Sequence, residues 1–397
     1  MLGRDRHAYA TLTLSLSLGC AAGAASDVMH GAATGEGEVS SGGVEATETS
    51  GDSVTMGPPL TPTDVQARAG ATQIVVTWMP SVLGDPPDTV HVLLDDSEVA
   101  AIAAPAESAT LDGLTPATVH RVSVVAENAG GRSEPSSELR VVTAFDPSAF
   151  PGTRLWLDAD DASSFTLVAD DRVSAWWDKS GRDNHAYQGL DSLMPQRVEG
   201  ARAGRATVRF DDAYVTTSDV VQLREKDAGY TVFGVVMNTT EDGISGNEGR
   251  GGILLGNFGD NTPNVGIELH EDRVLRQWWD VRDQPGLPSA GNTGDVRFPD
   301  PRPEQSAFAI LLFYRDGAAA KLGAAVDGEL ATELDDEGPL LSVTSPFRIG
   351  ADYRPSPLAV SWNGDIAELL VFDRLLDADE RLRLHEYLAD KWSIALQ

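Results

Sequence analysis

The sequence predicts an all-β protein made of two successive β-sandwiches and closed by a single C-terminal helix. Between Pro62 and Phe145, short runs with period-two alternation are separated by turn residues, which is typical of an all-β sandwich. From Phe150 onwards the strand-like runs are longer, and Gly, Asp and Asn separate them, as in a two-sheet jelly roll. Near the end of the chain, apolar residues recur at helical spacing. The length of 397 residues suits two or three domains.

Residues 1–20 have the features of a bacterial export signal. Arg4 and Arg6 precede an apolar run from Ala8 to Leu18 that is too short to span a bilayer. The end of this run resembles a bacterial lipobox, and the resemblance implies that the thiol of Cys20 carries a lipid. Cys20 is the only cysteine of the chain, so a disulfide is excluded.

The sequence offers two alternative cleavage sites for the export signal. Ser17 and Leu18 stand in the reverse of the usual lipobox order, and Ala22-Gly23-Ala24 fits the small-x-small rule of ordinary signal peptidase. We therefore expect either an outer-membrane or cell-surface lipoprotein or a freely secreted protein. A lipid at Cys20 would be its only link to a membrane.

Residues 21–59 are expected to form a disordered acidic linker, because small and acidic residues dominate and Lys and Arg are absent. Such a segment cannot bury enough apolar surface to offset its ordering entropy, and it predicts an extended stalk. The whole chain is acidic as well, with a formal net charge of −31. A field of this sign repels phosphate backbones, so nucleic acid is not expected as a partner.

Residues 60–145 contain the first sandwich, with its clearest strands at Gln73–Met79 and Val119–Ala126. The run from Leu114 to Ser133 resembles the E–F corner and F strand of a fibronectin type III domain, and Trp78 falls where that family places its core tryptophan. The resemblance implies a spacer or a weak interaction module. The family's corner tyrosine is His120 here, so an imidazole bond must replace the hydroxyl bond of that corner or the bond is absent.

Residues 146–397 contain the second sandwich and the helix. Asp377 and Glu380 form a capping-box pattern at the start of the helix, and its apolar face comprises Leu384, Tyr387, Leu388 and Trp392. The predicted strands are Arg154–Leu157, Val173–Trp177, Ala206–Phe210, Tyr230–Met237, Gly252–Phe258, Val265–His270, Val274–Trp279, Ala307–Tyr314, Leu322–Val326, Phe347–Ile349 and Ile366–Phe372.

Four blocks of this segment carry a second family resemblance. The blocks are Leu155–Asp161, Trp177–Ala186, Val208–Asp211 and Gly364–Asp373, followed by Tyr387–Trp392 in the helix. They resemble the laminin-G-like, concanavalin A-like jelly rolls of bacterial surface proteins. That resemblance implies a fold but no single activity, because lectins, adhesins and glucanases share it.

Catalytic motifs are almost absent. The seven histidines are scattered, and the chain has neither a nucleophile elbow nor a phosphate-binding loop. One string, Glu333-Leu334-Asp335-Asp336-Glu337, has the Glu-x-Asp-x-Glu spacing of jelly-roll β-glucanases, which use two carboxylates on one strand face. Because Gly338-Pro339 follows directly, we interpret the string as a solvated loop and predict no catalytic residue.

Aromatic residues give a stronger binding signal. Trp278 and Trp279 are adjacent on a predicted strand, so their side chains point to opposite faces and only one can be in the core. The other lies at an edge, under a loop, or at a sugar-stacking site. Arg276 and Asp280 favour the sugar site, since lectin sites combine an aromatic face with fixed charged groups.

A calcium site is the remaining candidate. Asp158 and Asp160 precede one turn, and Asp178 and Asn184 lie in a loop that the laminin-G-like family places at a sandwich edge. Their oxygen atoms suit Ca²⁺, although Asp and Asn are equally common as turn formers.

The sequence thus predicts a non-catalytic protein that binds carbohydrate or a cell-surface protein through the second sandwich. The alternatives are a glycoside hydrolase or lyase of the concanavalin A-like superfamily, or a purely structural envelope protein.

Overall fold

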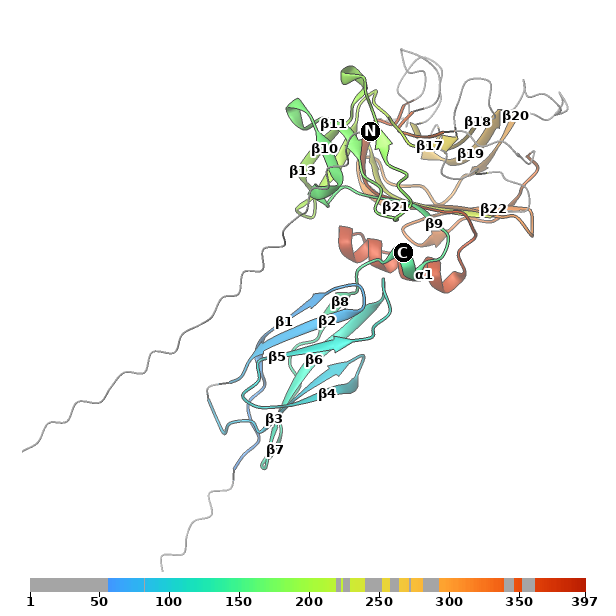
Figure 1. Cartoon of the computed structure of the whole chain (residues 1–397). Coiled ribbons are helices and arrows are strands. Elements are labelled where there is room, and N and C mark those ends of the chain that lie inside the picture. Colours follow the sequence, from blue (N-terminus) through green and yellow to red (C-terminus); the bar gives the residue numbers. More distant parts are fainter. Residues whose placement is uncertain are drawn as a thin grey trace, which may run out of the picture. The chain divides into compact units, whose positions relative to one another are not determined.

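The structure, a computed structural model, describes residues 56–81, 83–218, 223, 229–239, 252–257, 264–270, 273–280, 293–338, 346–351 and 361–397. The predicted all-β class is confirmed, because strands dominate these residues and α1, Ala378–Trp392, is the only α-helix among them (Figure 1). Cys20, the export signal and most of the expected linker lie outside the described residues. Within the described part, no helix has the length and hydropathy needed to cross a membrane.

The first sandwich consists of two antiparallel sheets. One sheet has the order β1-β2-β5, and the other has the order β4-β3-β6-β7 with β8 also paired to β6. The strands are β1 Thr63–Ala69, β2 Gln73–Met79, β3 Thr89–Leu94, β4 Ser97–Ala103, β5 Ser108–Asp112, β6 Val119–Asn128, β7 Gly131–Arg132 and β8 Leu139–Val142.

Alternation along β2 builds the core of this sandwich. Ile74, Val76 and Trp78 point inward and are at most 2% exposed, whereas Thr77 between them is exposed. They pack in one cluster with residues of β3 and β6, among them Val92 and Val124. The predicted core position of Trp78 is therefore occupied as expected.

The side chain of His120 forms a hydrogen bond at the E–F corner of the first sandwich. Its Nδ1 lies 2.8 Å from Asp95 Oδ2, and the other Asp95 oxygen accepts the backbone N–H of Arg121 at 2.9 Å. Burial favours a raised pKa for Asp95, but the hydrogen bonds from His120 and Arg121 outweigh burial and lower it. An imidazole–carboxylate pair thus replaces the tyrosine hydroxyl bond of the family.

The second sandwich has two larger sheets. We call β13-β14-β26-β16-β21-β22-β23 the helix-side sheet, in which β9 also pairs with β26 and β24 with β22. We call β10-β11-β12-β15-β25-β17-β18-β19-β20 the open sheet. The bounds are β9 Thr153–Asp158, β10 Phe165–Leu167, β11 Val173–Trp176, β12 Ala186–Tyr187, β13 Gln196–Arg202, β14 Arg205–Phe210, β15 Val215–Thr216, β16 Tyr230–Asn238, β17 Gly252–Asn257, β18 Asn264–Leu269, β19 Leu275–Asp280, β20 Thr293–Phe298, β21 Phe308–Asp316, β22 Lys321–Val326, β23 Glu329–Leu330, β24 Leu334–Asp335, β25 Phe347–Ile349 and β26 Gly364–Phe372.

The second sandwich is built in three layers. Its main core lies between the two sheets and includes Trp176, Phe210, Phe298 and Phe347, all almost completely buried. A separate cluster fills the space between the helix-side sheet and α1, which lies along that sheet in Figure 1. No described helix or sheet covers the outer face of the open sheet.

The start of α1 confirms the predicted capping box. The Asp377 carboxylate accepts the Glu380 backbone N–H, and the Glu380 carboxylate accepts the Asp377 N–H in return. Glu380 also binds the guanidinium of Arg374. These contacts fix where the helix begins.

Residues from the resemblance blocks converge on Glu368, which is 1% exposed. One carboxylate oxygen accepts from the Trp156 indole at 2.9 Å and the Tyr387 hydroxyl at 3.1 Å. The other oxygen accepts from Lys391 and from the Trp392 indole, both at 2.8 Å. These motif residues therefore attach α1 to the helix-side sheet, a structural role that is independent of any ligand.

Candidate functional site

Strand β19 carries the candidate binding residues that the sequence singles out. Along β19, Leu275 and Trp279 point into the main core, and Trp279 is 5% exposed. Arg276 and Trp278 alternate with them and are half-buried on the opposite face. The two adjacent tryptophans thus separate as the strand geometry predicts.

The indole of Trp278 packs against the neighbouring strand. It pairs directly with Gly266 of β18, where an added Cβ would stand 2.5 Å from the indole Nε1 and 2.7 Å from Cε2. These separations are far below a van der Waals contact, so only glycine admits the indole here. The indole therefore covers the backbone of β18 at Gly266.

Salt bridges to both neighbouring strands fix Arg276, which lies on the same face of β19 as Trp278. The Arg276 guanidinium donates to Glu268 of β18 and, at 2.6 Å, to Asp295 of β20. Asp295 also accepts from Arg297 at 2.6 Å. Burial favours a raised pKa for Asp295, but the two guanidinium groups outweigh it and lower the pKa, so the carboxylate is charged at neutral pH.

The remaining predicted member of this group is Asp280, the last residue of β19. Its side chain lies outside the described residues. A group that the sequence did not single out is His270, whose Nδ1 is 3.4 Å from the Glu268 carboxylate.

A second aromatic cluster lies where β11 ends and β12 begins, in the same sheet. The ring centroids of Trp177 and His185 are 4.7 Å apart, and those of Trp177 and Tyr187 are 5.9 Å apart, both edge-to-face. The His185 Nδ1 accepts the Asp178 backbone N–H, so in the neutral ring the proton is on Nε2. Tyr187 is 49% exposed. The sequence analysis missed Tyr187, although its alternation with the buried Ala186 was a usable signal.

The predicted calcium ligands all have protein partners. Asp158 lies within 3.0 Å of the ammonium groups of both Lys179 and Lys391, and Asp160 binds Arg205. The described residues contain no group of three or more His, Cys, Asp or Glu side chains that could hold a metal ion. A calcium ion at Asp158 or Asp160 would have to displace the lysine or arginine side chains that already pair with these carboxylates.

The other two predicted ligands shape their own loop. The Asp178 carboxylate accepts backbone N–H groups from Trp156, Ser180 and Asn184 at 2.9 to 3.0 Å. The Asn184 amide donates to the Arg154 carbonyl at 2.7 Å. These hydrogen bonds hold the loop in its turn. Turn formation is the structural role that the sequence offered as the alternative to calcium binding.

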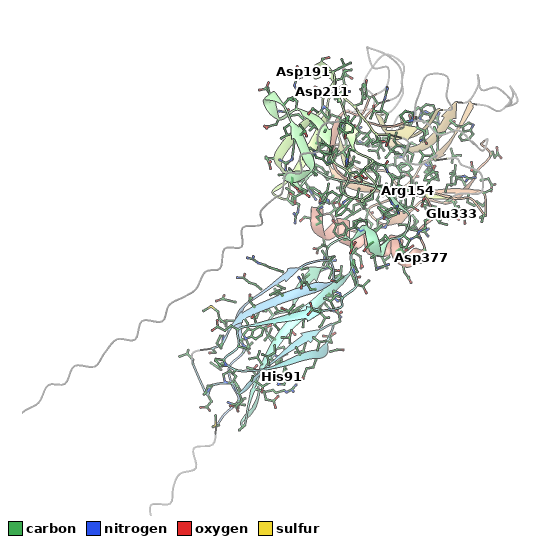
Figure 2. The ribbon with its side chains drawn as sticks, in the orientation of Figure 1. His91, Arg154, Asp191, Asp211, Glu333 and Asp377 are labelled. Atoms are coloured by element: carbon green, nitrogen blue, oxygen red, sulfur yellow. The ribbon has the colours of Figure 1, made fainter. Side chains whose placement is uncertain are left out.

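The glucanase-like string belongs to the helix-side sheet, where Glu333 is exposed (Figure 2). Glu333 accepts from the Tyr314 hydroxyl at 2.7 Å, Asp335 binds Lys321, and Asp336 binds Arg315. The strand β24 spans only Leu334–Asp335, so this segment has no long strand face on which Glu333 and Glu337 could be aligned. In the structure, the three acidic residues Glu333, Asp335 and Asp336 are thus hydrogen-bond or salt-bridge partners of other side chains.

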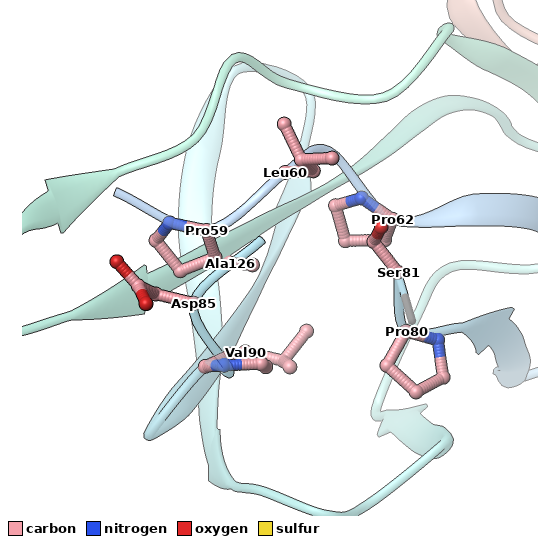
Figure 3. Close-up of a pocket in the computed structure, with 9 residues that line it drawn as sticks. Pro59, Leu60, Pro62, Pro80, Ser81, Asp85, Val90 and Ala126 are labelled. Carbon is pink, nitrogen blue, oxygen red and sulfur yellow. The ribbon is translucent and has the colours of Figure 1, made fainter. Parts of the chain in front are cut away.

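The first sandwich has a small apolar depression near its N-terminal strand (Figure 3). Pro59, Pro62, Pro80 and Val90 line it, and Asp85 is its only charged lining residue. It offers no room for a water molecule, so it does not qualify as a ligand site.

Residues 60–142 match the model of the fibronectin type III domain. The first sandwich is a fibronectin type III domain. Its two-sheet topology and the core position of Trp78 agree with that match. A search of curated protein sequences gave no significant match.

Solved structures similar to parts of the chain include the FN1–FN3 domains of chicken CNTN1, at 22% identity and a TM-score of 0.21, covering 22% of this chain and 33% of that one. The binding domain of Paraclostridial Mosquitocidal Protein 1 is similar at 14% identity and a TM-score of 0.41, covering 59% of this chain and 52% of that one. The CBM40 of the Ruminococcus gnavus IT-sialidase is similar at 14% identity and a TM-score of 0.32, covering 41% of this chain and 84% of that one.

The chain thus spans about a third and about half of the first two of these structures. TM-scores below 0.5 carry no argument about function, and the laminin-G-like assignment of residues 146–397 stays a prediction.

Proposed function

We propose that the second sandwich is a non-catalytic carbohydrate-binding module whose site is the outer face of the open sheet around Trp278. The observation that carries the proposal is the indole of Trp278, which packs against Gly266 beside the fixed Arg276–Asp295 pair. The fibronectin type III domain then serves as a spacer or a secondary interaction module.

The chemistry of this group suits a sugar. A pyranose ring has an apolar face of C–H groups that packs on an aromatic ring, and a rim of hydroxyl groups that need fixed hydrogen-bond partners. Trp278 offers the ring, while Arg276 and Asp295 offer a donor and an acceptor. Because the salt bridges already hold Arg276 in place, binding costs little further side-chain entropy.

The absence of catalysis is part of the proposal. Glycoside hydrolysis needs two carboxyl groups about 5 to 10 Å apart, one of them able to donate a proton. On the proposed face, Glu268 and Asp295 both bind Arg276, and the low pKa of Asp295 makes it a poor acid. We expect no release of reducing sugar from β-glucans. Release that disappears in Glu333→Gln would contradict this part.

The first test compares three variants of the full chain on a glycan array and by calorimetry. Trp278→Ala removes the ring, and Gly266→Ala displaces it without changing any polar group. Both should weaken glycan binding about tenfold, the effect of one lost aromatic contact. Gly189→Ala is the matched control, because an added Cβ there meets nothing within 4 Å.

Melting curves accompany each variant to show that it is folded. Addition of EDTA checks the separate prediction of calcium. A wild-type chain that binds no glycan would contradict the proposed function. Trp278→Ala with wild-type affinity would contradict the proposed site.

A further inference from the structure

We infer that Tyr187, with Trp177 and His185 beside it, forms a separate binding site for a single neutral sugar residue. The site lies where β11 ends and β12 begins. It goes beyond the proposed function, because it shares no residue with the group around Trp278 and would bind a sugar without that group. The exposure of the Tyr187 ring, its fixed aromatic neighbours and the polar atoms of the cluster support this inference.

The Tyr187 ring projects from the sheet between short side chains. Ala186 belongs to the main core, so strand alternation directs Tyr187 to the outer face. The residues directly opposite it are Ala175 of β11 and Thr216 of β15, and neither side chain is large enough to cover an aromatic ring. Tyr187 is therefore 49% exposed, and no other Phe, Tyr or Trp among the described residues is as exposed.

Two neighbouring rings hold Tyr187 in place. The centroids of Trp177 and His185 lie 5.9 and 6.2 Å from the Tyr187 centroid, and both contacts are edge-to-face. Each neighbour is itself fixed, since the Trp177 backbone N–H donates to the Ser164 carbonyl at 2.7 Å and the His185 Nδ1 accepts from the Asp178 N–H at 3.1 Å. A ligand that stacks on Tyr187 therefore immobilises little that is not already fixed.

The cluster also presents polar atoms to a ligand. Within the described part of the chain, the Tyr187 hydroxyl and the Trp177 indole N–H have no hydrogen-bond partner, and the indole N–H is not buried. In the neutral ring of His185 the proton is on Nε2, which lies 3.7 Å from the exposed carboxylate of Asp183. Two N–H donors and one hydroxyl group thus lie beside an exposed aromatic ring.

This combination suits a sugar residue better than a proline-rich peptide. The C–H face of a pyranose packs on an aromatic ring, and its hydroxyl groups need donors and acceptors at the rim. A proline-rich peptide instead needs a groove lined by several aromatic rings. Only Tyr187 of this cluster is exposed, and the rings of Trp177 and His185 are tilted 88° and 78° from it. One exposed ring accommodates one sugar residue.

The charges favour a neutral sugar. Arg182 and Asp183 are adjacent in the loop before His185 and are both exposed, so together they add no net charge to the site. The chain as a whole carries −31, which opposes a sugar that bears a carboxylate or a sulfate. A neutral residue meets no such penalty.

Saturation-transfer NMR with single-residue probes tests the inference on the full chain. The probes are the methyl glycosides of glucose, galactose, mannose and xylose, with methyl glucuronide as the anionic counterpart and decaproline as the peptide. For a neutral glycoside of this size we expect a dissociation constant on the order of 1 mM. The titrations use the Trp278→Ala chain, so the group around Trp278 contributes no aromatic contact.

Substitutions at Tyr187 identify the platform. In the Trp278→Ala chain, Tyr187→Ala should weaken binding of the recognised glycoside about tenfold, because the aromatic contact is lost. Tyr187→Phe keeps the ring and should retain most of the affinity. Leu190→Ala is the matched control, because Leu190 is 60% exposed in the same segment and has no aromatic ring. Melting curves show that each variant is folded.

The outcomes separate this site from the proposed one. Glycoside binding that disappears in Trp278→Ala, or that is equal in Tyr187→Ala and Leu190→Ala, would overturn the inference while the proposed function stands. Tighter binding of methyl glucuronide or of decaproline would also overturn it. Binding that persists in Trp278→Ala and is lost with Tyr187→Ala would support it, even if Trp278 contributes nothing. If no probe binds, the inference fails, whereas the proposed function is judged on the longer glycans of the array.

Discussion

Four donors converge on the carboxylate of Glu368 beneath α1, so this single side chain connects the helix to the sheet. Burial alone would lower the pKa of Lys391, but the carboxylates of Glu368 and Asp158 outweigh burial and raise it, so the lysine stays charged. Trp278 is positioned in another way, by packing against a glycine. Its position depends on the missing side chain of Gly266.

Replacing Glu368 by Gln should lower the free energy of unfolding by about 3 kcal/mol. The variant leaves the buried Lys391 with Asp158 as its only carboxylate and turns one acceptor oxygen into a donor that faces other donors. Seven of the eight tryptophans belong to the second sandwich, so their fluorescence in a urea titration reports this domain. Glu329→Gln, at an exposed strand residue, is the control and should change stability by less than about 0.5 kcal/mol. Equal effects of the two variants would refute the anchoring role.

Elements with a clear local pattern could be predicted from the sequence. β2 was predicted with its exact bounds, since apolar and polar residues alternate along it, and the capping box located the start of α1. β13, Gln196–Arg202, was missed because most of its residues are polar and its position depends on pairing with β14. β12 and β15 are two residues long, so only their distant partners define them.

The candidate site, too, could be predicted from the sequence only in part. Alternation along β19 was enough to predict that Trp278 and Trp279 separate to opposite faces. The partners of Trp278, which are Gly266 on one side and Asp295 on the other, come from strands whose register no local pattern specifies. Tyr187 was missed although it alternates with the buried Ala186, because β12 is only two residues long.

The helix α1 should make the second sandwich sensitive to mild acid through His385. Burial lowers the pKa of His385 to about 4, although its bond to the Arg381 carbonyl acts in the opposite direction. The folded state therefore holds the neutral ring, while the unfolded chain takes up a proton below its ordinary pKa of 6.5. Stability is complete above pH 6.5 and is lost as the pH falls towards 4, by about 3 kcal/mol at most.

Urea midpoints at neutral pH and at moderately acidic pH measure this loss. His385→Gln keeps a donor for the Arg381 carbonyl but cannot be protonated, so its stability should vary less with pH in this window. If the variant and the wild type show the same pH dependence, His385 is not the responsible group.

At the scale of the whole chain, the net charge of −31 is compatible with binding of a neutral glycan and opposes anionic partners. The proposed binding face, the helix anchor and the fibronectin type III domain use separate sets of residues. We therefore expect substitution at Trp278 to weaken the proposed recognition while the rest of the chain stays folded.

We predict that a lipid on Cys20 attaches the chain to the outer membrane. The prediction rests on the apolar run of the signal and on the small Gly19 that precedes the chain's single cysteine. Cys20→Ser removes the thiol and should move the protein from the membrane fraction to the soluble fraction or the medium, and it should abolish incorporation of labelled palmitate. Glycan binding by the released protein should equal that of the wild type, because the site lies far along the chain. A wild type that is already soluble and unlabelled, with an N-terminus after Ala24, would show instead that ordinary signal peptidase processes the chain and that it is secreted without an anchor.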